Sequence, residues 1–152
     1  MSFLQSMNIS GSGLTAQRLR MDIIAENIAN MDATRTAEGG PYRRKLAVFQ
    51  SMNKSDSGAF NKILFQNIND LSYNDRIRGV EVTEIVEDPE PFKMVYDPTH
   101  PDADENGYVA MPNVNSLKET SDMMEALRAY DANITAFNAI KKMASNALEL
   151  GK

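Results

Sequence analysis

The sequence SLKETSDMMEALRAYDANITAFNAIKKMASNALEL, residues 116–150, decides the fold expected for the chain. Apolar residues recur in it every seven positions, and no proline or glycine interrupts it. Seven residues are close to two turns of an α-helix, so these side chains lie on one side of it as a seam. The stretch is therefore predicted to be one helix of about 50 Å, at about 1.5 Å per residue. So long a helix is expected to extend beyond a compact domain of this size and to need a partner for its seam.

Two rows of side chains make up this predicted seam. The first row contains Met123, Tyr130, Phe137 and Ala144, and the second contains Leu127, Ile134 and Leu148, with Ala126, Ile140 and Ala147 beside them. Lys141 interrupts the second row, but its apolar stem can lie along the seam while its charge reaches water. Ser116 and Glu119 predict a capping box at the start of the helix, and Gly151 suits the left-handed residue that follows its end.

A second amphipathic stretch, residues 2–31, mirrors the first at the start of the chain. Gly11 and Gly13 each weaken a helix by about 1 kcal/mol relative to alanine, so a strong, continuous helix is expected only from Leu14 onward. Two such helices can pair antiparallel as a coiled coil and still leave apolar surface for neighbours. A helical hairpin that needs no partner explains the same periodicity. The apolar residues of this stretch are Met7, Leu14, Met21 and Ile28, spaced by seven, with Ile24, Ala25 and Met31 beside them.

Between the two helices the helical period disappears. Gly39-Gly40-Pro41 is a turn signal, and Leu46–Phe49 has the composition of a short strand. The polar, small residues of 50–61 are expected to form a mobile loop.

A β-hairpin is predicted further along, over residues 77–96. In Ile77–Val86 the apolar phase slips, which predicts a β-bulge, and apolar residues alternate again over 92–96. The segment 87–90 contains a proline and supplies the turn between the two strands. Leu46–Phe49 could add a third strand to this hairpin.

Residues 97–115, DPTHPDADENGYVAMPNVN, contain three prolines and no apolar period, so they predict an extended connector into the last helix. Asp102, Asp104, Asn106 and Gly107 match the first half of an EF-hand calcium loop. Position twelve, where such a loop needs a bidentate glutamate, is Asn113, so an acidic turn without a metal is expected. The connector residues singled out are Asp97, Pro98, His100, Pro101, Asp102, Asp104, Asn106, Gly107, Tyr108, Pro112, Asn113 and Asn115.

These patterns together predict a mostly α fold with a small β insertion. Residues 1–33 are expected to be the N-terminal helix of a two-helix coiled-coil core, and residues 116–152 its C-terminal helix. Residues 34–115 are expected to be a β-hairpin-rich middle element with the connector. The predicted assembly interface consists of Leu14, Met21, Ile24, Ile28, Met31, Met123, Leu127, Tyr130, Ile134, Phe137, Ile140, Ala144 and Leu148.

Composition narrows the class of function. The 152 residues carry a formal net charge of −5, which argues against nucleic-acid binding, and Arg43-Arg44-Lys45 is expected to be a solvated strand end. The absence of cysteine excludes disulfides and thiolate chemistry. His100 is the single histidine, and no motif for catalysis, a cofactor or a small-molecule substrate accompanies it, so an enzyme is not expected. The chain shows no secretory signal and no membrane span of about 20 apolar residues.

Residues 10–30, SGSGLTAQRLRMDIIAENIAN, are similar to the N-terminal signature of bacterial flagellar rod and hook proteins. The resemblance covers both ends of the chain and the connector, well over half of its length, whereas residues 50–74 carry little of it. The stretches that narrow the resemblance to rod proteins are Gly39–Lys45, Asp97–Asn115, Arg128–Asn133 and Ala136–Asn138.

Flagellar axial proteins form tubes in which the terminal helices pack as a coiled-coil inner core, often called D0, inside a β-rich region. The resemblance therefore implies a structural subunit of the proximal rod, the drive shaft that transmits torque from the motor to the hook and filament. It implies assembly with copies of itself, with the rod proteins FlgB, FlgF and FlgG, and with the basal-body protein FliE. It also implies export by the flagellar type III apparatus, without a cleaved signal peptide, to a rod in the periplasmic space.

Two other classes of function are compatible with the residues alone. A soluble coiled-coil adaptor or chaperone would clasp a partner between the two helices and be well folded by itself. A calcium-responsive module would use Asp102, Asp104 and Asn106. The terminal helices of a rod subunit, in contrast, are expected to be disordered before assembly, because an unpartnered seam buries too little apolar surface to offset an ordering cost of about 1–2 kcal/mol per residue.

Overall fold

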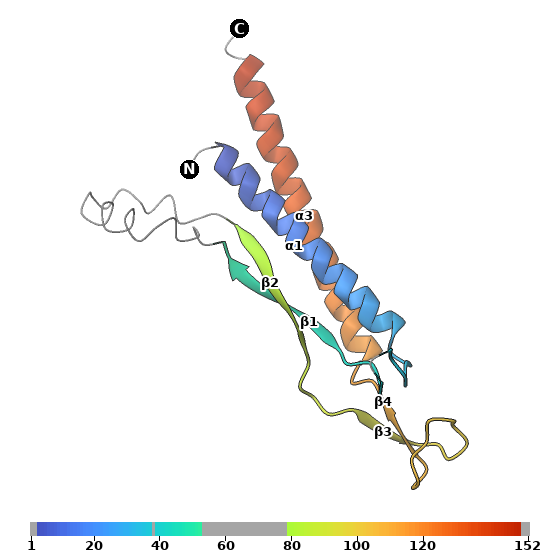
Figure 1. Ribbon diagram of the computed structural model, residues 1–152. Helices are drawn as coiled ribbons and strands as arrows, with labels where there is room; N and C mark the ends of the chain where they lie inside the picture. Colours follow the sequence, from blue (N-terminus) through green and yellow to red (C-terminus); the bar gives the residue numbers. More distant parts are fainter. Residues whose placement is uncertain (1–2, 38, 53–78, 150–152) are drawn as a thin grey trace, which may run out of the picture.

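The computed structural model describes residues 3–37, 39–52 and 79–149. Two long helices, α1 (Phe3–Ala29) and α3 (Ser116–Glu149), run antiparallel and side by side, and α3 continues past the start of α1 (Figure 1). Two short antiparallel strand pairs lie along and beyond them. The prediction of a mostly helical chain with a small β element between two terminal helices is confirmed.

The first helix begins eleven residues earlier than Leu14, where a continuous helix was expected, so that prediction is wrong. Gly11 and Gly13 lie inside α1, and tertiary contacts offset their low helix propensity. A Cβ added at Gly13 would lie 3.1 Å from the side-chain amide of Asn133, so glycine lets α3 approach closely there. Between the two glycines, the Ser12 hydroxyl donates to the Ile9 carbonyl at 2.8 Å and accepts from the Val80 N–H at 3.1 Å.

The last helix begins at Ser116 as predicted, but its cap is Asn115 and not a Ser116–Glu119 capping box. The Asn115 Oδ1 accepts from the Leu117 N–H at 3.1 Å, and the Asn115 carbonyl accepts the Glu119 N–H at 2.9 Å. Asparagine is among the best residues for this position because its side-chain oxygen satisfies an unpaired N–H of the first turn. The Glu119 side chain is turned inward, away from the cap.

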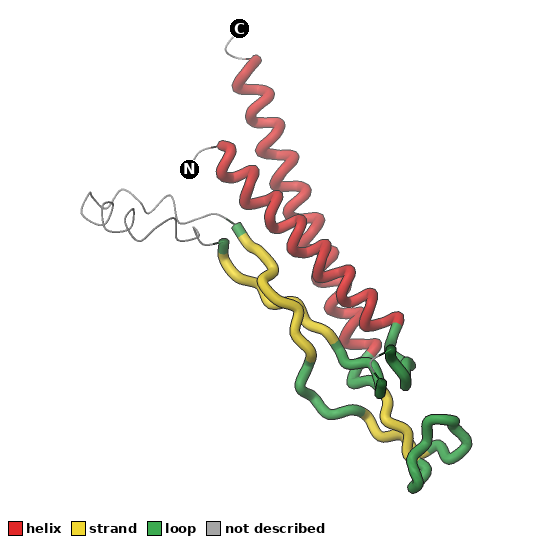
Figure 2. The backbone as a smooth tube through the Cα atoms, viewed as in Figure 1, coloured by secondary structure: helices red, strands yellow, loops and turns green. Residues whose placement is uncertain are grey.

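The first strand pair, β1 (Lys45–Ser51) with β2 (Val80–Glu87), lies along the helices (Figure 2). The register shifts where Val48 faces Glu84 and Phe49 faces Val82, so the predicted bulge in the second strand is confirmed. Thr83 is the extra residue. β1 spans the predicted strand 46–49 and is longer by one residue at its start and two at its end.

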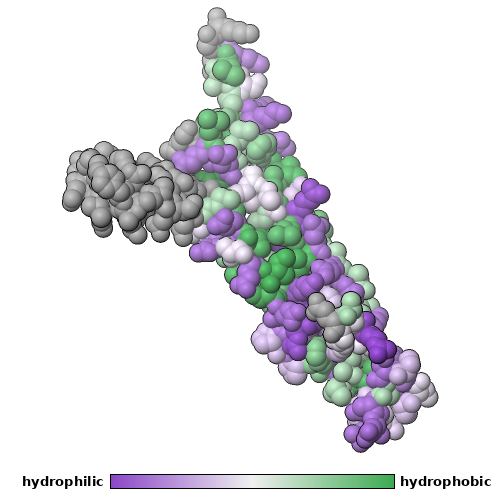
Figure 3. Space-filling view, in the orientation of Figure 1, coloured by the Kyte–Doolittle hydropathy of each residue, from purple (hydrophilic) through white to green (hydrophobic). Residues whose placement is uncertain are grey.

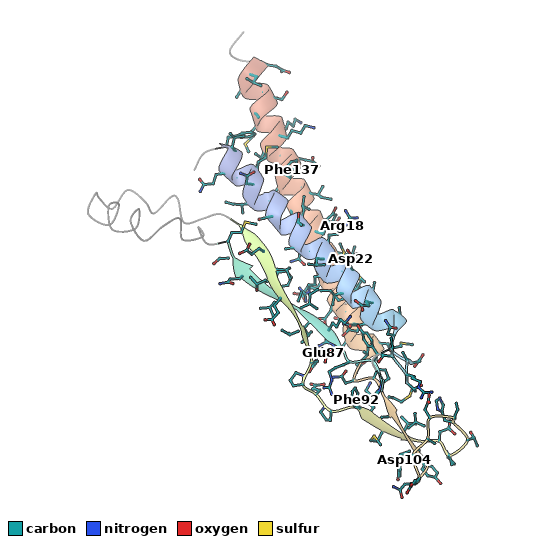
Figure 4. All side chains as sticks on the ribbon, viewed as in Figure 1. Arg18, Asp22, Glu87, Phe92, Asp104 and Phe137 are labelled. Carbon is teal, nitrogen blue, oxygen red and sulfur yellow. The ribbon has the colours of Figure 1, made fainter. Side chains whose placement is uncertain are left out.

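The predicted hairpin over 77–96 is wrong. β3 (Lys93–Tyr96) pairs with β4 (Tyr108–Met111) of the connector, so the connector is not simply extended. The segment after β2 cannot turn back, because the Asp88 N–H donates to the Arg44 carbonyl at 2.8 Å and Arg43 donates to the Asp88 carbonyl at 3.0 Å. These bonds carry the chain straight from one strand pair to the next; Glu87 and Phe92 flank this segment in Figure 4.

The buried apolar core of the described residues is small. The Gly151 cap, most of the predicted loop 50–61 and Ile77 of the predicted hairpin lie outside the described residues. Within the described residues, neither helix combines the length and apolar character that a membrane span needs. The buried apolar residues are Ala16, Ile23, Ile24, Tyr42, Val109, Val114 and Ala126.

Candidate functional site: the helix pair and a buried polar junction

The register of α1 against α3 is marked by two contacts on their shared face. Gly13 lies against the side chain of Asn133, and the Asn27 side-chain amide donates to Glu119 Oε2 at 3.1 Å. The step of fourteen residues from Gly13 to Asn27 along α1 matches the step of fourteen from Asn133 back to Glu119 along α3. Fourteen residues are two heptads, so the helices keep one antiparallel register over about 20 Å, at about 1.5 Å per residue.

The row of α3 that faces α1 is small and polar. Glu119, Ala126, Asn133 and Ile140 are spaced by seven, and Glu119 and Ala126 are each 0% exposed. The large apolar residues predicted as the seam lie beside this row and on the outer side of α3. Small side chains let two helices approach closely, while the larger apolar groups beside the row are only half-buried and Leu127 and Leu148 are exposed.

The predicted interface residues divide by burial. Ile24 is 5% exposed, whereas Met31 lies in the turn that follows α1 and is 37% exposed. Leu127 and Leu148 are exposed, at 45% and 76%. The half-buried members are Leu14, Met21, Ile28, Met123, Tyr130, Ile134, Phe137, Ile140 and Ala144. Figure 4 shows Phe137 on the half of α3 that runs toward the C-terminus.

Large apolar side chains remain exposed on both helices and on the first strand pair. Figure 3 shows apolar residues gathered over the middle of the molecule, where the strand pair lies along the helices. Apolar residues that gather into a continuous exposed surface, unlike single scattered ones, mark candidate contact sites, so the surface over the middle of the molecule is a candidate for subunit contacts. Exposed on α3 are Leu117, Met124, Leu127, Met143 and Leu148; on α1, Phe3, Leu4 and Leu19; on the strand pair, Val48, Phe49, Val80 and Ile85.

A cluster of buried polar side chains ties the strands to the end of the helix pair. We call it the polar junction: Asn27, Tyr42, Arg44, Asp88, Asn113 and Glu119. Its centre is Arg44, whose Nε donates to Glu119 Oε1 at 2.7 Å and whose Nη1 donates to Asp88 Oδ2 at 3.1 Å. Asp122, which is partly exposed, receives a third contact at 3.3 Å. Arg44 therefore links the segment before β1, the end of β2 and the first turns of α3.

Asn27 joins α1 to the junction. Its side-chain nitrogen donates to the Lys45 carbonyl at 2.9 Å as well as to Glu119. Its oxygen accepts from the Lys45 N–H and the Tyr42 hydroxyl, both at 2.9 Å. Asn27 is 1% exposed, and these bonds satisfy its polar atoms as burial demands.

Asn113 plays the same part for the connector. Its side-chain oxygen accepts from the Arg44 N–H at 2.8 Å, and its nitrogen donates to the Asp88 and Glu90 carbonyls at 3.3 and 3.1 Å. Asn113 thus holds the start of α3, the strand segment and the turn after β2 in one arrangement.

The junction favours the charged forms of its ion pair. Burial alone would lower the pKa of Arg44, but its hydrogen bonds with Glu119 and Asp88 outweigh this and raise it. The Glu90 N–H, together with Arg44, holds the pKa of Asp88 below its usual range. Burial, reinforced by Glu26 and Glu119, raises the pKa of Tyr42 to about 12. At neutral pH the three pKa shifts favour a charged Arg44, a charged Asp88 and a neutral Tyr42, which are the forms that make these hydrogen bonds.

The prediction that Arg43-Arg44-Lys45 is a solvated strand end is wrong at its middle residue. Arg43 and Lys45 pair with exposed carboxylates, Arg43 with Glu87 at 3.7 Å and Lys45 with Glu26 at 2.6 Å. Arg44 points the other way and is 6% exposed. Alternation along a strand was the available signal, because every second side chain points to the same face.

Acidic side chains of the connector accept hydrogen bonds within the connector and, at Asp102, from the segment that follows α1. Asp104 accepts from the Asn106 and Tyr108 N–H groups, at 2.9 and 2.8 Å, and Asp102 accepts from the Thr34 hydroxyl at 2.9 Å. Thr99 donates to Asp97 from both its hydroxyl and its N–H, which hold the pKa of Asp97 below its usual range. Among the described residues, no group of three or more acidic or histidine side chains is placed to hold a metal ion.

The remaining connector residues fall into two groups. Pro112 and Asn113 are buried at the junction, whereas the tip around Asp104 extends away from the helices (Figure 4). His100 is half-buried, and its Nδ1 accepts from the Asp102 N–H at 3.1 Å. Gly107 has a φ of 79°, which suits glycine at the turn before β4. Asp97 is half-buried; Pro98, Pro101, Asp102, Asn106, Tyr108 and Asn115 are exposed.

Comparison with known proteins assigns this architecture to a family. The model described as "Flagella basal body rod protein" matches residues 7–35, and the one described as "Flagellar basal body rod FlgEFG protein C-terminal" matches residues 105–150. The flagellar basal-body rod protein FlgC of Bacillus subtilis is 46% identical, with both chains covered in full. The chain belongs to the FlgC family of flagellar basal-body rod proteins. FlgC of Borreliella burgdorferi is 44% identical over 99% of this chain and 98% of that protein, and FlgC of Salmonella typhimurium is 38% identical over the whole of both.

The family confirms the function that the resemblance implied. The chain is a structural component of the rod of the flagellar basal body, in a family of structural proteins rather than enzymes. Assembly with other basal-body components follows from this role. The alternative hypothesis, that the chain is a soluble coiled-coil adaptor or chaperone, is therefore disfavoured.

Proposed function

We propose that this FlgC-family chain is a subunit of the proximal rod, in which α1 and α3 join a coiled-coil inner wall that transmits torque from the motor to the hook and filament. The observation that carries the proposal is the set of large apolar side chains that α1 leaves exposed on α3. Leu127 and Leu148 are 45% and 76% exposed, and Leu117 is 82% exposed. Fully burying each such side chain is worth about 1.5–3 kcal/mol.

The distribution of these residues suits contacts with several neighbours at once. They occur along the length of α3 and not in one patch, and α3 extends beyond α1 where Leu148 lies (Figure 1). Contacts between unlike surfaces of successive copies generate an open helical array, which is the symmetry of a shaft. Torque would then pass through helix–helix contacts, with the strand pairs held outside the core by the polar junction.

The partners proposed are further copies of the chain, the rod proteins FlgB, FlgF and FlgG, and the basal-body protein FliE. We propose that the chain leaves the cytoplasm through the flagellar type III export apparatus, without a cleaved signal peptide, and assembles in the periplasmic space. Its lack of cysteine is compatible with passage as an unfolded chain, since no disulfide would have to be undone.

Leu127→Asp tests the proposal when the variant gene replaces the native copy in a motile bacterium. The side chain is 45% exposed, so the substitution is expected to cost the isolated chain little stability while placing an unpaired charge in the proposed contact. Asn138→Asp is the matched control, since it adds the same charge at an exposed polar position of the same helix. The measurements are swimming in soft agar, the yield of purified rods and the amount of chain exported.

Leu127→Asp is expected to abolish rods and swimming while export continues, and Asn138→Asp is expected to retain both. Normal rods in the Leu127→Asp strain would contradict the proposed contact surface. A block in export, with the chain retained in the cytoplasm, would locate the defect before assembly and also contradict it.

A further inference from the structure

The small and apolar residues between α1 and α3 give little discrimination between one heptad register and the next. The ion pair that also crosses this contact, Arg20–Glu125 at 3.6 Å, is 71% exposed at the glutamate and adds little. The α3 row that faces α1 repeats every seven residues, and its members Ala126 and Asn133 are both small enough to lie against Gly13. A shift of α3 by one heptad, about 10 Å, would exchange one small residue for the other. The large apolar residues beside the row have the same spacing, so they too would find similar positions.

The polar junction does distinguish the registers. Glu119 is 0% exposed, and its two oxygens take hydrogen bonds from Asn27 of α1 and from Arg44. After a shift in one direction Asn27 would face Ala126, and after a shift in the other it would face the segment before α3. Either shift would take Glu119 away from Asn27 and Arg44. Asn27 would keep its bonds to Lys45 and Tyr42, but the buried glutamate would lose both of its partners, and this penalty falls only on the wrong pairing.

We propose that Glu119, held between Asn27 and Arg44, sets the register of α3 against α1. Arg44 and the Lys45 N–H, which donates to Asn27 Oδ1, extend the same register to the strand pair. The contact between Asn27 and Glu119 at one end of the helix pair then also positions the far end of α3, where Leu148 is exposed. The inference concerns the fold of one chain and does not rest on the proposed rod contacts.

Intramolecular disulfide formation in the purified full-length chain measures the register directly, because the chain has no cysteine of its own. Gly13→Cys is combined in separate variants with Asn133→Cys, which matches the observed register, or with Ala126→Cys or Ile140→Cys, which match shifts of one heptad. The proteins are oxidised at high dilution. The rate of each intramolecular bond is measured by mass spectrometry and by mobility on a non-reducing gel.

The three pairs are then placed in the background Arg44→Met/Asp88→Asn/Glu119→Leu, which removes the buried arginine together with both of its buried carboxylate partners. Replacing a complete buried ion-pair cluster by uncharged groups is often neutral or stabilising, whereas removing one partner alone strands a buried charge, so the triple variant is expected to keep its helices. Arg128→Met is the control, because it removes an arginine from an exposed position of α3. Helix content by circular dichroism is recorded for every variant.

In the unaltered and Arg128→Met backgrounds, the Gly13–Asn133 pair is expected to form at least about tenfold faster than either shifted pair, which corresponds to about 1.4 kcal/mol. In the triple variant with unchanged helix content, this preference is expected to fall to about threefold or less. The proposal is overturned if the triple variant keeps the full preference. It is equally overturned if the three pairs form at similar rates in the unaltered background, or if the triple variant loses its helices altogether.

Discussion

Where α1 finishes and α3 begins, Asn27 and Glu119 are 1% and 0% exposed, and both oxygens of the glutamate have partners. At the opposite end of the helix pair, Leu4 and Leu148 are 67% and 76% exposed. The two helices expose apolar groups along their length, Leu117 at 82% included, but the end at Asn27 and Glu119 also buries an ion-paired polar cluster. That cluster fixes how the segments of the single chain meet, whereas the exposed apolar groups belong to the contacts that we propose with neighbours.

The largest effect expected from this difference is the loss of Glu119. Glu119→Ala would leave Arg44, whose side chain is 8% exposed, with its strongest partner gone. Breaking a buried ion pair on one side costs about 3–5 kcal/mol. Leu148→Ala removes an apolar side chain at the opposite end of the helix pair. Because that site is exposed, the loss of stability is expected to stay within about 0.5 kcal/mol.

Urea unfolding of the purified chain, followed by circular dichroism, measures both changes. A similar loss of unfolding free energy in Glu119→Ala and Leu148→Ala would contradict the prediction that the junction end contributes more to the stability of the single chain. A smaller m-value in Glu119→Ala would mean that less surface is exposed on unfolding. The free energies of unfolding of the two variants would then be compared at one urea concentration between their midpoints.

A smaller effect is expected at the middle of the pair. Ala126 is 0% exposed in the row that faces α1, so Ala126→Leu would overpack the contact, at a cost of about 1–3 kcal/mol. Ala139→Leu makes the same change at an exposed position of α3 and is expected to be close to neutral. The midpoint of thermal unfolding for the two variants provides the test, and an equal fall in both would place Ala126 outside the tight part of the interface.

The long helices could be predicted from the sequence because their evidence is local. Seven-residue spacing, the absence of proline and the polar start at Ser116 all lie within the stretch that forms α3. The bulge in β2 was also visible, as a slip in the alternation of Val80, Val82 and Ile85. The family resemblance carried the function, which the periodicity alone left open between a rod subunit and an adaptor.

The polar junction could not be predicted, because its partners are far apart in sequence. Arg44 and Glu119 are separated by 75 residues, and Asn27 and Glu119 by 92. Glu119 has the spacing from Ser116 of a capping residue, and only its burial shows that it serves a tertiary contact. The pairing of β3 with β4 was missed for a related reason: the bonds that keep the chain from turning at Asp88 come from the segment that precedes β1.

Acid is expected to weaken the junction end first. The Glu90 N–H and Arg44 hold the pKa of Asp88 below its ordinary value of 3.8, so this carboxylate contributes stability that is fully present above that value. The contribution is lost as the pH falls below about 4 and through the lowered pKa of the folded chain. Asp88→Asn is expected to be less stable at neutral pH and to show a shallower loss between pH 4 and pH 2. The test is the urea midpoint of both proteins measured from pH 4 to pH 2. If the midpoint falls equally steeply with pH in both, protonation of Asp88 does not cause the loss of stability in acid.

The smallest effect separates two glycines that lie two residues apart in α1. A Cβ added at Gly11 would meet nothing within 4 Å, so Gly11→Ala is expected to stabilise the chain by about 0.5–1 kcal/mol through helix propensity and a less flexible unfolded state. At Gly13 the same atom would lie 3.1 Å from the Asn133 side chain, which would have to move by a few tenths of an ångström. Gly13→Ala is therefore expected to gain less than Gly11→Ala, or to lose stability. Combining it with Asn133→Ala should restore the full gain, because the crowded amide is then absent. If both glycines gave the same increase in the urea midpoint, the two helices would be farther apart at this point than the contact with Asn133 requires.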